Sequence, residues 1–568
     1  MDVSSSKTAL VLLVAAAGSV IFLATRNTPA KRNSDGRVPP VLPSALPIIG
    51  HLLQFLSNPE KLLTKASTHY GPETPVQLRL ANRRVTMING VNNILSLFKG
   101  SRGLSSEKWL VQILVNGFGV NPSDTPFYLA DNTGIGQQPV SESNPVPAEH
   151  RIFYQSYHST HDGLAGKRLE ELQNQFIRNF HNQIQQADIS TDGGWTNTPD
   201  LYLKLLQGMF FRASVTSFCG PLIFQHVPSL ESDFWTFEKS LKHLVRELPR
   251  WLAPAAHNAR DKMKENIAKW HQLAREGYGD TDMETDERLW EENFGSKLFR
   301  SRQVMYSKMP LKKDSPTAED TALLWASAAN ATPAFGWMIL ETLQRPGLLE
   351  RVRAEIAPFV TFPPDGGTPD IDIEGLCQQP LIQSIYAEVL RVHVSMILAR
   401  LPQKHGFSIG GWQLAKDDLI MASSYQTARA ASVWNPGTPE KPHPLDDFWA
   451  ERFIVDPNDP SSGPVLPHLR PDESRVDQAE KPTRPYFSMD GTAGSWLPYG
   501  GGARMCPGRH FAKREIIMGM AMFLTAFDVE LEPRDSWIEH DMEYFMFGVM
   551  HPKGPVPARL RRRDVKAE

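Results

Sequence analysis

The C-terminal part of the chain contains the stretch Pro498-Tyr499-Gly500-Gly501-Gly502-Ala503-Arg504-Met505-Cys506-Pro507-Gly508-Arg509. Its three consecutive glycines allow positive φ angles and a close approach of the backbone to a flat or bulky group. A helical pattern follows directly, and a cysteine at the mouth of a helix has its thiolate favoured by the positive end of the helix dipole. A thiolate offered from a tight glycine turn is the arrangement needed for axial ligation of a haem iron by Cys506.

Composition restricts the remaining possibilities. The chain has 568 residues, of which 41% are hydrophobic and 22% charged, and its formal net charge is −3. This length is ample for a large core, and the balanced charge gives no argument for binding nucleic acid. The three cysteines, Cys219, Cys377 and Cys506, are too few for a disulfide framework and favour a reducing compartment.

The N-terminal segment has the properties of a membrane anchor. Residues 8–25 form an uncharged run of 18 residues, just long enough for a transmembrane helix. The alternative is a cleaved signal peptide, whose apolar core is usually shorter. Four basic residues follow the run and one precedes it, which places the C-terminal side in the cytosol. We expect an anchor in residues 1–25, a basic and proline-rich linker in 26–50, and a catalytic domain in 51–568.

Residues 318–343 are a strong helix candidate with apolar side chains on nearly every side, as in a helix that crosses a large core. Asn330 and Pro333 interrupt this pattern. A proline inside a helix removes one hydrogen bond, which here frees the carbonyl group of Ala329. The interruption predicts either a functional opening or a simple kink.

A second helix is predicted over residues 380–394, where Glu388 and Arg391 share one face. The pair is either an exposed ion pair of little value or, given its apolar neighbours, a buried one. A buried pair needs a third partner to satisfy the remaining arginine donors, and Arg452 is the candidate.

Short strands are predicted over residues 76–80 and 85–88, and on both sides of a Gly410-Gly411 turn within residues 407–421. Residues 544–548 are compatible with a hairpin. The basic residues Arg559 and 561–563 are typical of a solvated end.

Together these stretches resemble the cytochrome P-450 family of haem-thiolate proteins over roughly residues 38–560. The family's Glu-x-x-Arg pair is matched by Glu388 and Arg391, and the end of its Pro-x-Arg-Phe motif by Arg452-Phe453, with Ala450 at the usual proline position. The haem-binding motif Phe-x-x-Gly-x-Arg-x-Cys-x-Gly is matched by Tyr499, Gly502, Arg504, Cys506 and Gly508. This chain departs from the motif only at Tyr499, which replaces the phenylalanine.

The resemblance implies a mainly α fold with small β-sheets, in a single large catalytic domain behind an N-terminal transmembrane helix. It implies haem with Cys506 as the axial thiolate, and Arg504 and Arg400 as partners of the haem propionates. It also implies that Glu388, Arg391 and Arg452 form a structural triad that locks the thiolate loop. The positions that usually line the family's substrate pocket are apolar here and are equally compatible with plain core; they are Leu323, Ala326, Met396, Ile397, Phe545 and Met546.

The oxygen-side helix departs from the family's usual acid–threonine pair. Asn330 takes the place of the acid and Ala331 that of the threonine, followed by Thr332 and Pro333. This pattern is similar to the branch that holds the sterol 7α- and 12α-hydroxylases and prostacyclin synthase. An amide cannot act as a carboxylic acid at neutral pH, but it donates and accepts hydrogen bonds. Proton delivery is then expected to rest on Asn330, Thr332, ordered water and the Ala329 carbonyl.

Three functions fit the resemblance. The first is monooxygenation of a bulky apolar substrate (a steroid, terpenoid or other secondary metabolite) with O2. Its electrons would come from NADPH through a partner reductase, because residues 500–505 fail the dinucleotide motif at Met505. The second is rearrangement of an oxygenated substrate without O2 or reductase. The third, a non-enzymatic haem-binding scaffold, is disfavoured by the polar opening at Asn330. The anchor implies the endoplasmic reticulum membrane, crossed once, with the catalytic domain in the cytosol.

Overall fold

The computed structural model describes residues 37–46, 48–100, 103–131, 134–136, 146–278, 282–363, 366–416, 418–470 and 482–563. The predicted anchor at residues 8–25 lies outside this part of the chain. Among the described helices, none has the length and apolar character needed to cross a membrane.

The described residues fall into two compact units. The first lies within residues 1–106, 397–432 and 493–497, and the second within 107–396, 433–492 and 498–568.

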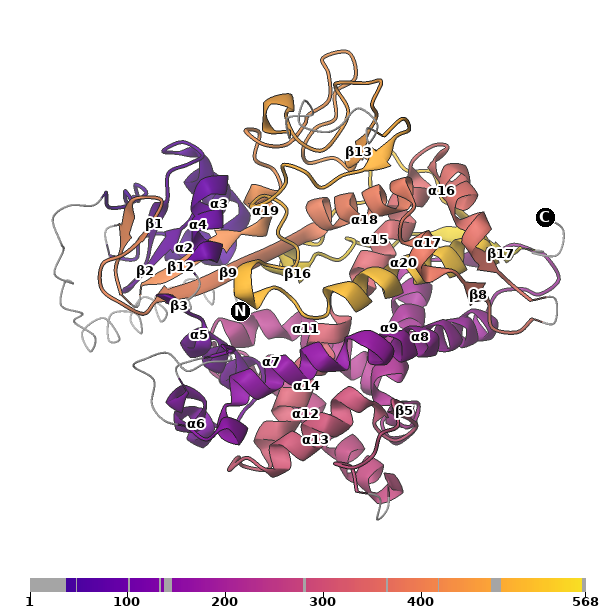
Figure 1. Ribbon diagram of the computed structural model, residues 1–568, viewed down its shortest axis with the longest axis horizontal. Helices are drawn as coiled ribbons and strands as arrows, with labels where there is room; N and C mark the ends of the chain where they lie inside the picture. Colours follow the sequence, from indigo (N-terminus) through magenta and orange to yellow (C-terminus); the bar gives the residue numbers. More distant parts are fainter. Residues whose placement is uncertain are drawn as a thin grey trace, which may run out of the picture. The chain divides into compact units, whose positions relative to one another are not determined.

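The first unit is built on a sheet with the strand order β1-β2-β12-β9 (Figure 1). Strands β1 and β2 are antiparallel, β12 runs parallel to β2, and β9 is antiparallel to β12. The predicted strands at residues 76–80 and 85–88 are therefore confirmed. Gly410 and Gly411 form the predicted turn between β10 and β11, with φ angles of +55° and +84° that favour glycine. The elements of this unit are α2 (Leu52–Ser57), α3 (Pro59–Thr68), α4 (Val91–Lys99), α19 (Ser424–Thr427), β1 (Val76–Leu80), β2 (Arg83–Met87), β3 (Leu104–Ser105), β9 (Val394–Pro402, whose first three residues belong to the second unit), β10 (Phe407–Ile409), β11 (Trp412–Leu414) and β12 (Leu419–Ser423).

The second unit is mainly helical, and α15 lies in its core. Every residue of α15 from Ala331 to Thr342 is buried, and the helix packs against α9, α18 and α20 (Figure 1). The main helices are α5 (Glu107–Ile113), α6 (Thr125–Ala130), α7 (Ile152–Gly163), α8 (Gly166–Gln186), α9 (Gln207–Cys219), α10 (Leu222–His226), α11 (Leu230–Val245), α12 (Pro254–Tyr278), α13 (Lys297–Ser307), α14 (Asp314–Ala328), α15 (Ala331–Gln344), α16 (Leu348–Ile356), α17 (Ile373–Leu376), α18 (Pro380–His393) and α20 (Arg509–Ala526). The short strands are β4 (Thr196–Thr198), β5 (Trp290–Glu291), β6 (Gly295–Ser296), β7 (Val360–Thr361), β8 (Asp370–Ile371), β13 (Ile454–Val455), β14 (Tyr486–Phe487), β15 (Phe527–Leu531), β16 (Phe547–Val549) and β17 (Ala558–Arg562).

The helix predicted over residues 318–343 is divided between α14 and α15. The division falls at Ala329 and Asn330, just before Pro333. Proline is tolerated in the first turn of a helix, where its missing N–H would have no partner within the helix. The predicted interruption is therefore confirmed, and Pro333 belongs to the first turn of α15.

Helix α18 matches the prediction over residues 380–394. Pro380 occupies its first turn, and the carboxylate of Glu355 on α16 accepts hydrogen bonds from the N–H groups of Leu381 and Ile382 at 3.1 and 3.0 Å. A negative group at this end satisfies free N–H groups and complements the helix dipole. This cap fixes the start of the helix that carries Glu388.

The basic residues Arg559 and 561–563 do not form the expected free end, although Arg559 and Arg561 are exposed as expected. These residues lie in or next to β17, which pairs with β15 on one side and β4 on the other. Arg561 donates to Asp528 at 3.0 Å, and Arg559 pairs with Glu530. Alternation along β17 buries Leu560 between these arginines, so the basic pattern belongs to the outer face of a strand.

The hairpin predicted at residues 544–548 is also wrong in its extent. The segment forms a 3₁₀ turn followed by β16, which pairs with residues 394–396 of β9. The residues that flank this segment, His540 and Pro552, form an antiparallel bridge with each other.

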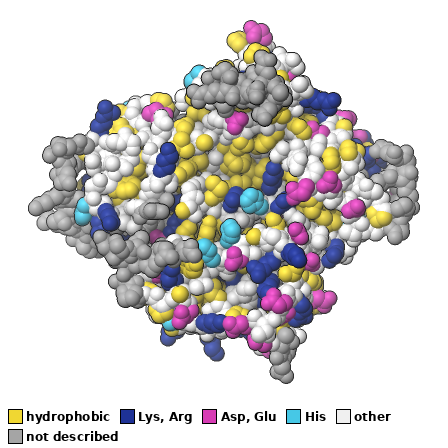
Figure 2. All heavy atoms as spheres, in the orientation of Figure 1, with side chains coloured by type: hydrophobic (Ala, Val, Ile, Leu, Met, Phe, Trp, Pro, Cys, Tyr) yellow, Lys and Arg dark blue, Asp and Glu magenta, His cyan; other side chains and the backbone are white. Residues whose placement is uncertain are grey.

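On the face drawn in Figure 2, acidic and basic side chains are interspersed, in keeping with the net charge of −3.

Candidate functional site

The cysteine loop, residues 498–508, is shaped by glycines with positive φ angles. Gly500 and Gly502 have φ angles of +72° and +67°, a region that a side chain disfavours. The N–H group of Cys506 donates to the carbonyl of Tyr499 at 3.0 Å, which draws the two ends of the loop together. Helix α20 begins at Arg509, so Cys506 lies directly before a helix, as predicted.

The environment of the Cys506 thiol combines burial with nearby donors. Burial raises its pKa, while the N–H groups of Gly508 and Arg509 act in the opposite direction, and the net shift is upward. The N–H groups at the helix start therefore lower the pKa of Cys506, as predicted, but burial raises it by more. Coordination to a metal ion deprotonates a thiol outright, so this half-buried sulfur fits the role of a haem ligand.

Arg504 lies on the same loop and is held by Glu107 of α5, whose carboxylate accepts from its Nη2. Burial lowers the pKa of Arg504 to about 10. A partly desolvated guanidinium is the kind of group that binds a carboxylate such as a haem propionate, and it retains further donors beside the one used by Glu107. Arg400 belongs to the first unit, on β9, where its Nη1 donates to the carbonyl of Ala399 at 2.8 Å. Burial lowers the pKa of Arg400 as well.

Glu388, Arg391 and Arg452 meet in the interior as predicted. The Nε of Arg391 lies 2.6 Å from Glu388 Oε2, and the Nε of Arg452 lies 2.9 Å from Glu388 Oε1. All three side chains are fully buried. Burial alone would raise the pKa of Glu388, but the two guanidinium groups lower it to about 2.

The cluster also holds the backbone of residues 444–452. Glu388 Oε1 accepts from the N–H group of Trp449 at 3.1 Å, and Arg391 Nη1 donates to the carbonyl of Leu445 at 2.7 Å. The extra donors of the arginines are thus used, as a buried ion pair requires.

Asn330, at the break between α14 and α15, has its side-chain oxygen engaged by β16. Oδ1 accepts from the N–H group of Val549 at 3.0 Å. A Cβ atom at Gly548, whose φ is +128°, would lie 2.0 Å from this oxygen, so only glycine allows the approach. By contrast, Thr332 is fully buried and its Oγ1 has no partner among the residues that the structure describes. A buried hydroxyl of this kind calls for a water molecule or a ligand.

The predicted pocket residues lie on three elements. Leu323 and Ala326 lie on α14, where Leu323 is half-buried and Ala326 is exposed. Phe545, just before β16, is buried. Met396 on β9 pairs with Phe547 of β16, which brings it close to Met546. Ile397, the next residue of β9, belongs to the first unit.

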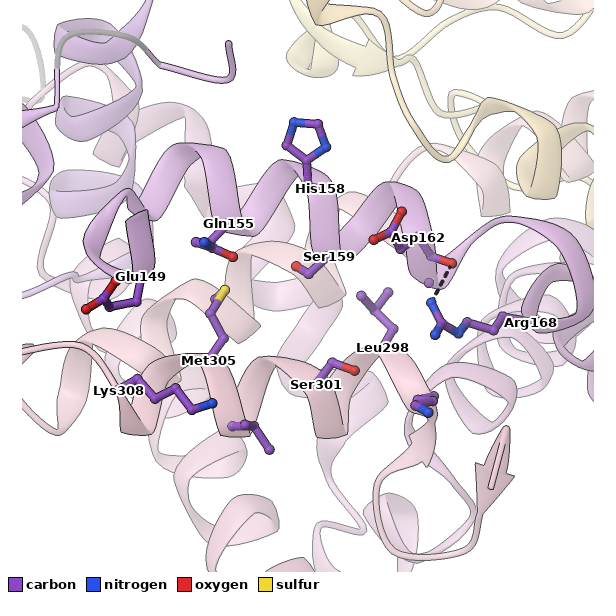
Figure 3. A pocket seen from close by; sticks show the side chains of 13 residues that line it. Glu149, Gln155, His158, Ser159, Asp162, Arg168, Leu298, Ser301, Met305 and Lys308 are labelled. Atoms are coloured by element: carbon purple, nitrogen blue, oxygen red, sulfur yellow. Dashed lines mark hydrogen bonds between the residues drawn. The ribbon is translucent and has the colours of Figure 1, made fainter. Parts of the chain in front are cut away.

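A separate pocket of about 450 Å³ lies between α7 and α13 and contains none of the predicted site residues. Figure 3 shows Gln155 and Ser159 of α7 facing Met305 and Ser301 of α13, while His158 points away from the gap. Cationic and anionic side chains are mixed around it, so its charge favours no ligand class. Its lining residues are Glu149, Gln155, His158, Ser159, Asp162, Gly163, Arg168, Lys297, Leu298, Ser301, Val304, Met305 and Lys308.

Sequence reasoning missed three partners of the site. Glu107 contacts Arg504, Gly548 allows the approach to Asn330, and the Tyr386 hydroxyl forms a hydrogen bond with the Tyr499 hydroxyl. Of these, only Tyr386 had a signal, namely its place on the predicted helix two residues before Glu388.

Comparisons with known proteins agree with this geometry. The sequence model of the cytochrome P450 family matches residues 39–556. A cytochrome P450 monooxygenase of Hormonema carpetanum, efuG, is 35% identical over 534 residues, covering 93% of this chain and 90% of the relative. The 25-hydroxycholesterol 7-alpha-hydroxylase of Rattus norvegicus is 24% identical over 417 residues, covering 71% and 87%.

The structure of retinoic-acid-bound cyanobacterial CYP120A1 matches with a TM-score of 0.63 at 19% identity, covering 94% of this chain and all of that one. This match shows the fold, mainly helical with small sheets. The family model and the fungal relative both span nearly the whole described chain. The chain therefore belongs to the cytochrome P450 family of monooxygenases, which bind haem through a cysteine thiolate.

Proposed function

We propose that the chain is a membrane-anchored monooxygenase that inserts one atom of O2 into a C–H bond of a bulky apolar substrate. Two electrons and two protons reduce the other oxygen atom to water. The observation that carries the proposal is the cysteine loop, in which positive-φ glycines and the Cys506 N–H bond present a half-buried thiol at the start of α20. The fungal relative named as a monooxygenase supports the reaction class. The sterol hydroxylase of the rat supports a steroid or similarly bulky terpenoid skeleton as substrate.

Each residue has a separate task in this proposal. Cys506 would hold the haem through its thiolate, and the bound haem would supply the site of O2 activation. Arg504 would bind a haem propionate, and the Glu388–Arg391–Arg452 cluster keeps residues 444–452 on α18. Thr332 holds a proton-carrying water through its buried hydroxyl. Asn330 keeps β16, and with it Phe545 and Met546, against the break between α14 and α15.

The electrons come from NADPH through a separate reductase, because the chain has no nicotinamide or flavin motif of its own. The run at residues 8–25 holds the enzyme to the endoplasmic reticulum membrane, with the catalytic domain in the cytosol.

A rearrangement enzyme that works without O2 or reductase is the second candidate. Two observations favour it: Asn330 and Ala331 replace the family's acid–threonine pair, and the amide oxygen of Asn330 is already engaged by Val549. An engaged amide is a weaker substitute for a proton-delivering acid than a free one.

Turnover of a steroid and terpenoid panel, measured with and without O2 and reductase, separates the two candidates. We expect product only when NADPH, reductase and O2 are all present, with one oxygen atom of the product labelled from ¹⁸O2. Product formed from an oxygenated substrate under nitrogen, without reductase, would instead establish the rearrangement.

A further inference from the structure

The cysteine loop is tied to α18 by a pair of tyrosines. The hydroxyl groups of Tyr386 and Tyr499 form a hydrogen bond, and Tyr386 is only 5% exposed. Tyr499 also accepts the Cys506 N–H bond on its backbone carbonyl at 3.0 Å. A single residue thus contacts α18 through its side chain and Cys506 through its backbone.

Tyr386 also contacts the segment that follows Cys506. The Nζ of Lys513, on the second turn of α20, lies 6.0 Å from the centroid of the Tyr386 ring and donates to Gln383 Oε1 of α18 at 2.9 Å. A cation at this distance from a ring face is attracted to it. The Tyr386 side chain therefore touches the chain on both sides of Cys506.

Tyr386 and Glu388 both lie on α18. Residues two apart on a helix point to different faces, so Tyr386 and Glu388 bind different partners. Glu388 binds Arg452 and the backbone of Trp449, while Tyr386 binds the cysteine loop. Helix α18 is therefore a common support for both segments.

The family motif has phenylalanine at the position of Tyr499, and phenylalanine has no hydroxyl group to form this bond. Burial raises the pKa of both tyrosines, so both remain neutral phenols over the ordinary pH range. The bond therefore joins two neutral hydroxyl groups, and breaking it removes a stabilising contact of the loop.

We propose that Tyr386 is a positioning residue for the haem ligand. Its hydroxyl group, bonded to that of Tyr499, holds the Cys506 loop in place. The inference rests on the proposed role of Cys506. Removing the Tyr386 hydroxyl breaks this bond to the loop, loosens the loop and allows the thiolate to be lost more readily, without changing the ligand itself.

The test uses the full-length holoenzyme and its reduced carbon-monoxide complex. A thiolate ligand gives a red-shifted Soret band, and loss of the thiolate gives the unshifted band. We expect Y386F to retain haem but to convert from the shifted to the unshifted form about 5–10 times faster on mild warming. The double variant Y386F/Y499F should convert at about the rate of Y386F, since both variants lack the same bond.

Tyr128→Phe is the matched control, because Tyr128 is a fully buried tyrosine whose hydroxyl donates to Glu319 at 2.8 Å, on α6 and α14. It should lower the unfolding temperature without changing the conversion rate below that temperature. If Y386F folds too poorly to load haem, Y499F breaks the same bond from the loop side and is measured in the same way.

Equal conversion rates for the wild type, Y386F and Y499F would overturn the proposal. So would acceleration that matches that of Tyr128→Phe, since the effect would then be general destabilisation. Failure of the underlying ligand assignment is distinguishable, because Cys506→Ser would in that case retain the shifted band.

Discussion

Burial and hydrogen bonding act in opposite directions on the thiol of Cys506. The upward shift of its pKa means that the protein alone does not hold a thiolate there. The loop geometry, with positive φ at Gly500 and Gly502, presents the sulfur, and coordination itself removes the proton. The fold thus places the Cys506 sulfur for coordination but does not by itself deprotonate it.

Cys506→Ser is expected to abolish the red-shifted Soret band of the reduced carbon-monoxide complex, because a serine hydroxyl is not an anionic sulfur ligand. Difference spectra of the purified protein measure this directly. Cys377→Ser is the control and should retain the band, since burial raises the pKa of Cys377 to about 11 and the residue lies outside the glycine loop. A Cys506→Ser protein with an intact shifted band would remove Cys506 from the ligand role.

Glu388→Gln is expected to lower the free energy of unfolding by about 3–5 kcal/mol, because it leaves two buried guanidinium groups without a counter-charge. Denaturant unfolding measures the change. Glu374→Gln on α17 is the control. Its carboxylate pairs with Arg514 but is 71% exposed, so the change should stay within about 0.5 kcal/mol.

The same residue predicts a pH dependence. The folded-state pKa of Glu388 is about 2, below its ordinary value of 4.5. Its contribution to stability is therefore complete above pH 4.5 and is lost as the pH falls towards 2. The unfolding free energy of the wild type should fall more steeply over this range than that of Glu388→Gln; parallel curves would contradict the burial of an ionised carboxylate.

At the level of elements, a side-chain hydrogen bond joins the break between α14 and α15 to strand β16. Asn330 at the break accepts a hydrogen bond from Val549, and Gly548 leaves room for the amide. The polar residue in the interrupted helix is thus a structural contact as well as a candidate for proton delivery.

Asn330→Ala is expected to increase the share of NADPH electrons lost to peroxide while leaving haem content unchanged, because β16 loses its anchor beside Thr332. Asn330→Asp retains an oxygen acceptor for the Val549 N–H group and should recover part of the coupling. Peroxide formed per NADPH consumed is the measurement. Fully coupled turnover in Asn330→Ala would exclude the residue from the mechanism.

Gly548→Ala is expected to destabilise the fold by about 1–3 kcal/mol or more, since a φ of +128° is strained for alanine and its Cβ would meet Asn330 Oδ1 at 2.0 Å. Gly554→Ala is the matched control, with a φ of +72° but open space around the added Cβ. Thermal unfolding should show the larger loss for Gly548→Ala. Similar losses for the two variants would show that the contact with Asn330 carries no energy.

At the scale of the whole molecule, the family match is continuous over residues 39–556, so the chain is one catalytic domain by descent although its described residues form two compact units. The N-terminal residues 1–25 are expected to add only attachment. Deleting them should move the protein from the membrane to the soluble fraction while the shifted Soret band is retained. Continued membrane association of the truncated protein would show that another surface is sufficient for binding.

Local patterns predicted much of the fold. Helix α18, strands β1 and β2 and the turn at Gly410-Gly411 follow from periodicity, proline and glycine within short windows. Local patterns do not predict the strands at 547–549 and 558–562, because their partners, β9, β15 and β4, are distant in the sequence. Within a short stretch of sequence, a basic strand and a basic tail have the same residue pattern.

The sequence by itself determined the family, the cysteine loop and the Glu388–Arg391 pair, because these depend on residues a few positions apart whose relative placement a turn or a helix dictates. The contacts of Arg504 with Glu107, of Tyr499 with Tyr386 and of Asn330 with Val549 were decided only by the tertiary structure. Their partners lie more than a hundred residues apart, and packing of whole helices, rather than any local preference, brings such side chains within hydrogen-bonding distance.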